Sequence, residues 1–301
     1  MQKSTLIIIL ILIVGLIPIS IYFIETYSLD IDTSSLPNRE LTLLEQQAQA
    51  FAGLLVKPVY MMLSLVIILA LIGQKRPQII ALHWGQIAFL AGEIFCAINF
   101  YIFKHESILS EYLHSYGMAL AFGFTTFALL EGWEMRLGSR SNSRLAREAR
   151  VILQFAIPML AILAFIPLVA PLQSDAYAVS IFGFQYSYTR FDFYETYERR
   201  VLPLIALIAF VVAYLPLLKT GESSIPYITK FFVCAGIGAL GFAFFRVALN
   251  AIFVNHLVWF EFWEEATELM FVSAIGFILW RYKTFLLEKT PMLENVSTIW
   301  K

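Results

Sequence analysis

The residues of this chain that could carry chemistry are concentrated in one short stretch. Four glutamates occur there within eight residues, namely Glu261, Glu264, Glu265 and Glu268. If the stretch is helical, a rotation of about 100° per residue places all four carboxylates within an arc of about 100°. Phe262, Trp263 and Met270 then occupy the opposite face. A carboxylate stripe backed by such residues must face the protein interior or a hydrated cavity.

Other ionisable or polar groups lie inside or at the ends of apolar segments elsewhere in the chain. They are Glu93, Asn99, Arg246 and Asn250, together with the histidines His105, His114 and His256. A single arginine cannot neutralise so many carboxylates, so the remainder must be protonated, hydrated or bound to cations. Glutamate and histidine are also the usual protein ligands of zinc, iron and manganese. A transition-metal ion is therefore the cofactor that this set of residues could hold.

Three interpretations of this set remain open. In the first, Glu93, Glu264, Glu265 and Glu268, with Arg246 as fixed counter-charge and Asn250 beside them, bind or conduct protons or metal cations. In the second, the protein is a membrane-embedded metal-dependent oxidoreductase or a subunit of a redox complex. The metal ligands would then include His114, His105, His256 and Glu261. In the third, the polar groups form a hydrated network that specifies helix packing, and the chain is a structural subunit of a membrane complex.

The composition indicates a membrane protein. Of the 301 residues, 59% are hydrophobic and only 14% are charged. A water-soluble domain carries about 25% charged residues on average, so this chain is suited to a lipid environment. The formal net charge of −1 offers no basic surface for phosphates, which argues against a nucleic-acid partner. Neither a nucleotide-binding glycine loop nor a zinc-protease motif occurs in the sequence.

Eight apolar segments predict an all-α bundle of about eight transmembrane helices in a single membrane domain, 1–301. Each is close to the roughly 20 residues that cross a bilayer core of about 30 Å. The segments are 5–25, 51–73, 78–103, 113–136, 151–172, 201–219, 227–254 and 258–282. Two connections are long, at 26–50 and at 173–200.

The depth of the polar groups in the predicted helices points to a common pocket. At a rise of about 1.5 Å per residue, Glu264 to Glu268 lie about 9–15 Å from the nearer membrane surface, Glu93 about 15 Å and Arg246 about 12 Å. Asn250 is shallower, and the three histidines lie near that surface. Because these groups come from different helices but share one level, we expect them to meet in one cavity.

The distribution of basic residues predicts the orientation. When the eight segments alternate in direction, 14 of the 21 lysines and arginines fall on one side of the membrane. The positive-inside rule makes that side cytoplasmic, so both termini are predicted to be cytoplasmic and the polar pocket lies in the outer half. The expected location is a bacterial-type inner membrane.

The outer connection 173–200 is rich in aromatic residues. From Phe182 to Tyr188, aromatic side chains alternate with small or polar ones, a period of two that is typical of an extended hairpin. We expect this hairpin to lie at the lipid headgroups as an aromatic belt, or to serve as a lid or as a docking face for a periplasmic or membrane protein partner.

A short internal similarity suggests that the chain consists of two parallel four-helix repeats. Asn99 precedes His105 by six residues, and Asn250 precedes His256 by the same interval. An even number of helices per copy would relate the halves 1–150 and 151–301 by an axis along the membrane normal.

Overall fold

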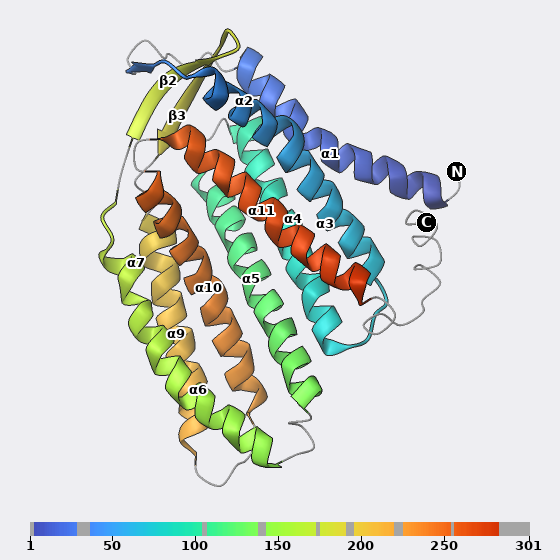
Figure 1. The fold of residues 1–301 in the computed structure, drawn as a ribbon, viewed down its shortest axis with the longest axis vertical. Coiled ribbons are helices and arrows are strands. Elements are labelled where there is room, and N and C mark those ends of the chain that lie inside the picture. Colours follow the sequence, from blue (N-terminus) through green and yellow to red (C-terminus); the bar gives the residue numbers. More distant parts are fainter. Residues whose placement is uncertain are drawn as a thin grey trace.

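A computed structural model describes residues 3–28, 37–103, 107–137, 143–172, 175–190, 196–219, 225–253 and 256–282. These residues form an elongated bundle of helices with one small sheet at one end (Figure 1). The predicted all-α fold is confirmed. The segment that contains His105 lies outside the described residues.

The long helices follow the predicted apolar segments, with several shifts at their ends. The α-helices are α1 (Lys3–Ser28), α2 (Leu43–Phe51), α3 (Lys57–Leu71), α4 (Pro77–Phe103), α5 (Ile108–Leu137), α6 (Ser143–Leu163), α7 (Phe165–Val169), α9 (Leu202–Tyr214), α10 (Tyr227–Ile252) and α11 (Leu257–Arg281). The second predicted span begins earlier than expected, because Thr42 and Glu45 form a reciprocal capping box that starts α2.

Within the described residues, six helical segments are long and apolar enough to cross a membrane. They are 43–71, 77–99, 108–135, 144–169, 197–218 and 227–252. The protein is therefore a multi-pass membrane protein. α1 contributes a shorter apolar stretch, Thr5–Ser20. α11 has 25 residues but carries the four glutamates, so its apolar part alone is too short to meet the same standard. The total of eight spans stays a prediction.

Two short π-helical turns occur in the described helices, one inside the predicted segment 51–73 and one just before the predicted segment 201–219. The turn η2 (Ala52–Val56) joins α2 to α3, and the turn η3 (Tyr197–Val201) leads into α9. In each, the residue after the turn donates its backbone N–H to the carbonyl five residues earlier, from Lys57 to Ala52 and from Leu202 to Tyr197. A 3₁₀ turn, η4 (Leu215–Leu218), ends the α9 segment.

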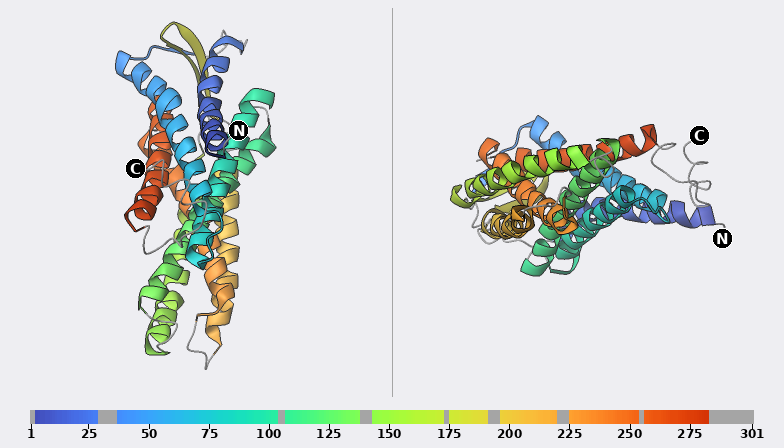
Figure 2. Two further views of the ribbon diagram at one scale, coloured as in Figure 1. Left: turned by 90° about the vertical axis from the view of Figure 1, so that its right-hand side faces the viewer. Right: turned by 90° about the horizontal axis from the view of Figure 1, so that it is seen from below.

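Helix α5 lies in the middle of the bundle, with α4 packed along one side and α10 along the other (Figure 1). α9 packs against α10, and α6 packs against α9. On the other side, α1 packs against α3 and α3 against α4. α11 crosses the bundle obliquely and packs on α2, η2 and α3 (Figures 1 and 2).

Small residues allow α4, α5 and α10 to approach one another closely. A methyl group at Gly117 of α5 would lie 2.7 Å from the carbonyl oxygen of Ala88 and 2.7 Å from the Cα of Gly92, both on α4. On the opposite side of α5, a methyl group at Gly238 of α10 would overlap the carbonyl of Ala119. These contacts fix the two neighbours of α5 at the short distance that small residues permit.

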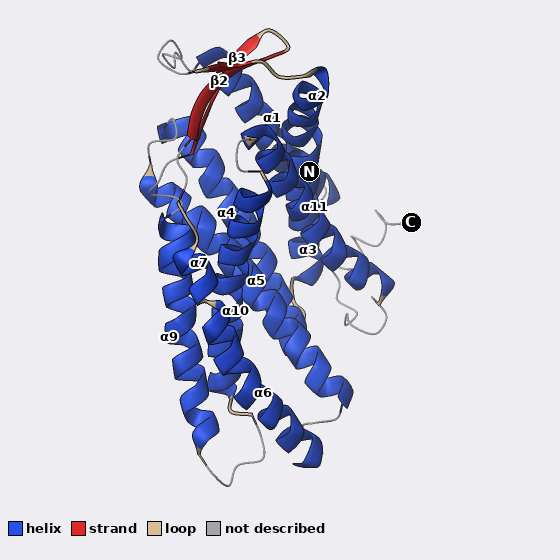
Figure 3. Ribbon diagram, turned by 60° about the vertical axis from the view of Figure 1, so that its left-hand side comes forward, coloured by secondary structure: helices blue, strands red, loops and turns tan. Residues whose placement is uncertain are grey.

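A three-stranded sheet closes one end of the bundle (Figure 3). β1 (Asn38–Arg39) pairs in parallel with β2 (Asp175–Ile181), which pairs antiparallel with β3 (Phe184–Arg190). The turn is Phe182–Gly183, and both residues have positive φ, 49° and 88°, as the tightest hairpin turns require. The predicted hairpin is therefore present, although its first strand lies before the alternating aromatic residues rather than within them.

The hairpin covers the beginning of α11. Tyr177, Val179 and Ile181 of β2 form a buried apolar cluster with Leu257 and Val258. The Tyr177 hydroxyl also accepts a hydrogen bond of 2.9 Å from the Leu257 backbone N–H.

We call this end of the bundle the sheet end. The opposite end, where Lys75, Arg76, Arg144, Arg147 and Lys219 lie, is called the basic end.

Three features stay predictions: the side of the membrane on which the termini lie, the side that each end of the bundle faces, and the relation between halves 1–150 and 151–301. The aromatic connection 173–200 is described only in part, since 173–174 and 191–195 lie outside the described residues.

Candidate functional site

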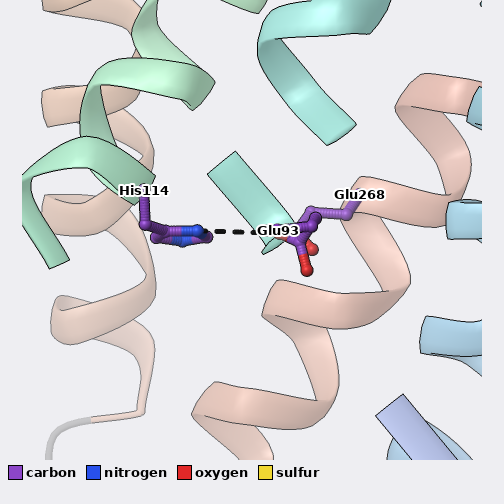
Figure 4. Close-up of side chains that lie close together, drawn as sticks. All are labelled: Glu93, His114 and Glu268. Atoms are coloured by element: carbon purple, nitrogen blue, oxygen red, sulfur yellow. Dashed lines mark ion pairs between the residues drawn. The ribbon is translucent and has the colours of Figure 1, made fainter. Parts of the chain in front are cut away.

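Three side chains from three helices meet near the sheet end of the bundle. Glu93 of α4, His114 of α5 and Glu268 of α11 each offer a ligand atom, and these atoms all lie within 4.8 Å of one another (Figure 4). Glu93 is completely buried and Glu268 is 8% exposed. We call these three residues the triad. The protein is thus a membrane-spanning helical protein with a buried Glu/His cluster that could bind a metal ion.

The close contact between α4 and α5 positions two members of the triad. The backbones touch at Gly92 and Gly117, one residue before Glu93 and three residues after His114. His114 Nδ1 lies 3.2 Å from the Gly92 carbonyl oxygen and 3.7 Å from Glu93 Oε1. If Nδ1 carries the proton, it donates to this carbonyl and Nε2 keeps its lone pair for a ligand.

A lysine and a tyrosine of α3 hold the carboxylates beside the triad. Lys57 Nζ lies 3.1 Å from Glu93 Oε2 and 2.8 Å from Glu265 Oε1. The Tyr60 hydroxyl lies 2.8 Å from Glu93 Oε2 and 2.6 Å from Glu265 Oε2. We call the triad together with Lys57, Tyr60 and Glu265 the Lys57 cluster.

Two carboxylate oxygens of the Lys57 cluster have no hydrogen-bond donor among the described residues. They are Glu93 Oε1 and Glu268 Oε2, and both are buried. Glu93 uses its other oxygen for Lys57 and Tyr60, so Oε1 remains directed to the triad. An unsatisfied carboxylate oxygen in a buried position is costly. A cation between the three side chains would remove that cost.

A second cluster of ion pairs adjoins the Lys57 cluster, because Glu264 and Glu265 are neighbours on α11. Arg246 of α10 donates from Nε to Glu198 Oε2 at 2.6 Å, and it pairs through a terminal nitrogen with Glu264. Ser115 donates to the other oxygen of Glu198 at 3.1 Å. The guanidinium also lies over the Phe260 ring, 4.8 Å from its centroid. We call these residues the Arg246 cluster.

The charges of the two clusters do not balance. Together they hold two permanent cations, Lys57 and Arg246, and five carboxylates. Three negative charges therefore lack a permanent counter-charge within these clusters when every carboxylate is ionised. The ion-paired side chains are at most 17% exposed, so water screens them poorly. The Lys57 cluster, with three carboxylates around one ammonium group, carries the larger part of the excess.

The structure divides the predicted site residues between several places. Glu93, His114, Glu265 and Glu268 meet in the Lys57 cluster, whereas Glu264 and Arg246 belong to the Arg246 cluster. Glu261 accepts a hydrogen bond of 2.9 Å from Gln49 of α2. Asn250 is buried, and its Oδ1 has no partner in the described part of the chain.

His256 stands apart from the triad. It is exposed at the start of α11, and its Nδ1 lies 2.5 Å from a guanidinium nitrogen of Arg39. Along α11, it precedes Glu268 by 12 residues, or about 18 Å. Of the histidines proposed as ligands, the described structure brings only His114 to Glu93 and Glu268; His105 lies outside the described residues.

Sequence reasoning missed Lys57, Tyr60 and Glu198. Lys57 had a detectable signal, since it is a lysine inside an apolar segment and needs an anionic partner. Glu198 was hidden because the predicted helix began at residue 201, whereas the π-helical turn η3 places it in the bundle. Tyr60 gave no signal that distinguishes it from other apolar-segment aromatics.

The sequence matches no family model, and neither the curated proteins nor the solved structures searched show significant similarity to it. The assignment of a function therefore depends on the geometry of the two clusters.

Proposed function

We propose that the protein binds a cation in the membrane at Glu93, His114 and Glu268, and that it conducts this cation, or protons that compete for the same site, across the bilayer. One observation supports this above all others. Glu93 Oε1 and Glu268 Oε2 are buried without a donor in the described chain, and both carboxylates converge with an imidazole. A bound cation satisfies both oxygens and reduces the excess negative charge.

The ligand chemistry favours a divalent transition metal. Two carboxylates and one imidazole suit Zn²⁺, Mn²⁺ or Fe²⁺, whereas Ca²⁺ and Mg²⁺ prefer sites made entirely of oxygen. Ligand atoms about 2.1 Å from a tetrahedral metal lie about 3.4 Å from one another. In the structure the three ligand atoms are separated by up to 4.8 Å, so they must move closer together to bind a metal. Rotation of the glutamate side chains can bring them closer.

Metal analysis of the purified protein tests the binding step. After loading with Zn²⁺ or Mn²⁺ and dialysis, the wild type is expected to retain about one ion per chain, because three ligands converge. Glu268→Gln and His114→Asn are expected to lose it. Glu148→Gln, whose parent side chain is 55% exposed, is the matched control and should retain the ion. A wild-type protein that retains none of these metals would contradict metal binding.

Flux into reconstituted vesicles tests conduction. Wild-type protein is expected to carry Mn²⁺ or protons down an imposed gradient, and Glu93→Gln and Glu268→Gln should abolish the flux while the protein remains folded. Normal flux in both variants would overturn the proposal. In the orientation predicted from the basic residues, the sheet end faces outward and the site lies in the outer half of the membrane.

A second candidate function, metal-dependent redox chemistry, is favoured by one observation. The triad supplies three ligands, which leaves a fourth position open as in catalytic metal sites, and the Tyr60 phenol donates to the ligand Glu93. A stoichiometric iron or manganese with a redox-dependent optical or paramagnetic spectrum, in a protein without flux, would select this function. A folded wild-type protein that neither binds metal nor conducts ions would instead indicate a structural role.

A further inference from the structure

Four phenylalanine rings form a continuous layer on the basic-end side of the triad. Phe89 of α4 lies 5.9 Å from Phe271 of α11, measured between ring centroids. Phe271 lies 5.1 Å from Phe122 of α5, and Phe122 lies 6.3 Å from Phe242 of α10. We call these four residues the aromatic layer. Each comes from a different helix, so the layer extends across the bundle.

The aromatic layer lies on the basic-end side of the site in every helix. Along α4, Phe89 is about 6 Å from Glu93, and along α11, Phe271 is about 4.5 Å from Glu268. Phe122 follows His114 by eight residues, or about 12 Å along α5. Phe89 also contacts the site directly, since its ring packs edge-on against Tyr60 with centroids 5.6 Å apart.

The inward face of α11 changes character at this level. On the sheet-end side, Glu261, Glu265 and Glu268 follow one another at successive turns of the same face. On the basic-end side, the same face carries Val272, Ile275 and Leu279, which are at most 6% exposed. Charged side chains therefore lead from the sheet end to the triad, and apolar side chains continue beyond it.

Polar groups reappear on α4 and α5 beyond the aromatic layer. Gln86 precedes Glu93 by seven residues, so it lies on the same face of α4 about 10.5 Å nearer the basic end. It is completely buried, and neither of its amide atoms has a partner among the described side chains and backbone. Thr125 Oγ1, also buried without a partner there, would lie 3.6 Å from a methyl group built on the neighbouring Gly85.

Buried amide and hydroxyl groups without protein partners require water. An unsatisfied buried amide costs several kcal/mol, and ordered water is the usual compensation. Gln86 and Thr125 are thus buried polar groups without described partners on the basic-end side of the aromatic layer, and the carboxylates lie on its sheet-end side. The layer is the apolar barrier between two polar regions.

We infer that Phe89, Phe122, Phe242 and Phe271 form the gate that a cation or proton must cross between the triad and the polar region at Gln86. This inference rests on the proposed function, which supplies the identity of the ion that crosses the gate. Apolar constrictions block ions because they exclude water, and they open when side chains move apart. In the present arrangement the rings are in contact, so the gate is closed, and Glu261 and Glu265 lie on the sheet-end side of Glu268 along α11.

Proton leak into vesicles tests the gate. The protein is reconstituted with a pH-sensitive dye inside, and a potassium diffusion potential drives protons inward. Phe271→Ala is expected to raise the leak by about tenfold over wild type, because a smaller side chain lets water enter the constriction. Phe277→Ala is the matched control, since Phe277 lies on the same helix and is 59% exposed. Equal leak rates in both variants overturn the inference.

Two further variants complete the test. Phe271→Leu removes the ring but keeps an apolar side chain, so it serves if the alanine variant does not fold; it too is expected to leak more than Phe277→Ala. Adding Gln86→Leu to Phe271→Ala should return the leak toward the wild-type rate, and an unchanged leak would show that the route does not pass Gln86. The leak needs no retained metal. If the wild type neither binds nor conducts a cation, the proposed function is refuted. If Phe271→Ala nevertheless leaks protons, the aromatic layer is still the barrier to protons.

Discussion

The Arg246 cluster and the Lys57 cluster lie side by side on α11, through Glu264 and Glu265, but they differ in how their carboxylates are satisfied. In the Arg246 cluster, Glu198 receives a donor on each oxygen, from Arg246 and from Ser115. In the Lys57 cluster, Glu93 and Glu268 each keep a buried oxygen without a donor in the described chain. A completed ion pair stabilises the fold, whereas an incomplete one leaves ligand atoms available.

The chemistry of the two cations explains part of this difference. An arginine presents several donors in a planar fork, so Arg246 can serve two carboxylates from two different nitrogens. A lysine presents a compact ammonium group, which Lys57 shares between Glu93 and Glu265. Among the described residues no ion pair joins Lys57 to Glu268, so Glu268 keeps a buried oxygen without a donor within the triad. Four predictions test the comparison, from the largest expected effect on stability to the smallest.

Removing Arg246 should destabilise the protein most. Arg246→Gln leaves Glu198 and Glu264 buried beside each other without a cation, and breaking a buried pair in this way costs about 3–5 kcal/mol. Thermal unfolding in detergent should show a large loss relative to wild type. Arg246→Lys keeps the charge and should lose less. An unchanged unfolding temperature for Arg246→Gln would mean that this cluster does not stabilise the fold.

Tyr60→Phe should have an intermediate effect. It removes the hydroxyl that Glu93 and Glu265 share, and hydrogen bonds to charged groups contribute about 1.5–3 kcal/mol. The same unfolding assay measures the loss. Tyr227→Phe is the control, because the Tyr227 side chain is 69% exposed. If both variants unfold like wild type, the hydroxyl adds nothing to the Lys57 cluster.

Gly117→Ala tests the helix contact that positions the triad. The added methyl group would meet backbone atoms of α4 at 2.7 Å, and such overpacking costs about 1–3 kcal/mol. Gly132→Ala on the same helix has no atom within 4 Å of the new methyl group and should not destabilise. Separation of α4 from α5 should also weaken metal retention. A Gly117→Ala protein with wild-type stability and metal content would argue against this scaffold.

Glu268→Gln should change stability least while it abolishes metal retention. The substitution keeps the size of the side chain and removes one excess negative charge, so we expect a change within about 0.5 kcal/mol or a small gain. Unfolding of metal-free wild type and variant gives the comparison. A loss as large as that of Arg246→Gln would show that Glu268 is paired for stability, and the contrast between the clusters would fail.

Helix periodicity and depth predicted much of the site. The apolar segments predicted the long helices, and counting at 1.5 Å per residue brought Glu93 and Glu268 to one level. That Glu264 to Glu268, Glu93 and Arg246 act as one pocket stays a prediction, and the structure divides these residues between two adjoining clusters. Glu264 and Glu265 are neighbours, so about 100° separates their side chains, and they enter different clusters.

The remaining site residues depend on packing that one sequence does not specify. Lys57 meets Glu265 across 208 residues of chain, and no local pattern links them. The entry of Glu198 into the bundle depends on a π-helical turn, for which sequence periodicity gives no signal. The aromatic layer was likewise hidden, because phenylalanine in an apolar segment is ordinary.

The π-helical turn η2 makes the chain before Lys57 tolerant of a single-residue deletion. A π-helical turn holds one residue more than an α-helical turn, so deleting one residue of 52–56 restores a regular α-helix without breaking it. The five π-helical residues turn the chain about as far as four α-helical residues do, so α2 would keep its orientation relative to α3 and Gln49 would stay near Glu261. Deletion of Ala50 or Phe51, in the regular part of the helix, would instead rotate Gln49 by about 100° away from Glu261. Single-residue deletions are therefore expected to be accepted inside 52–56 and excluded in the α-helical residues just before it.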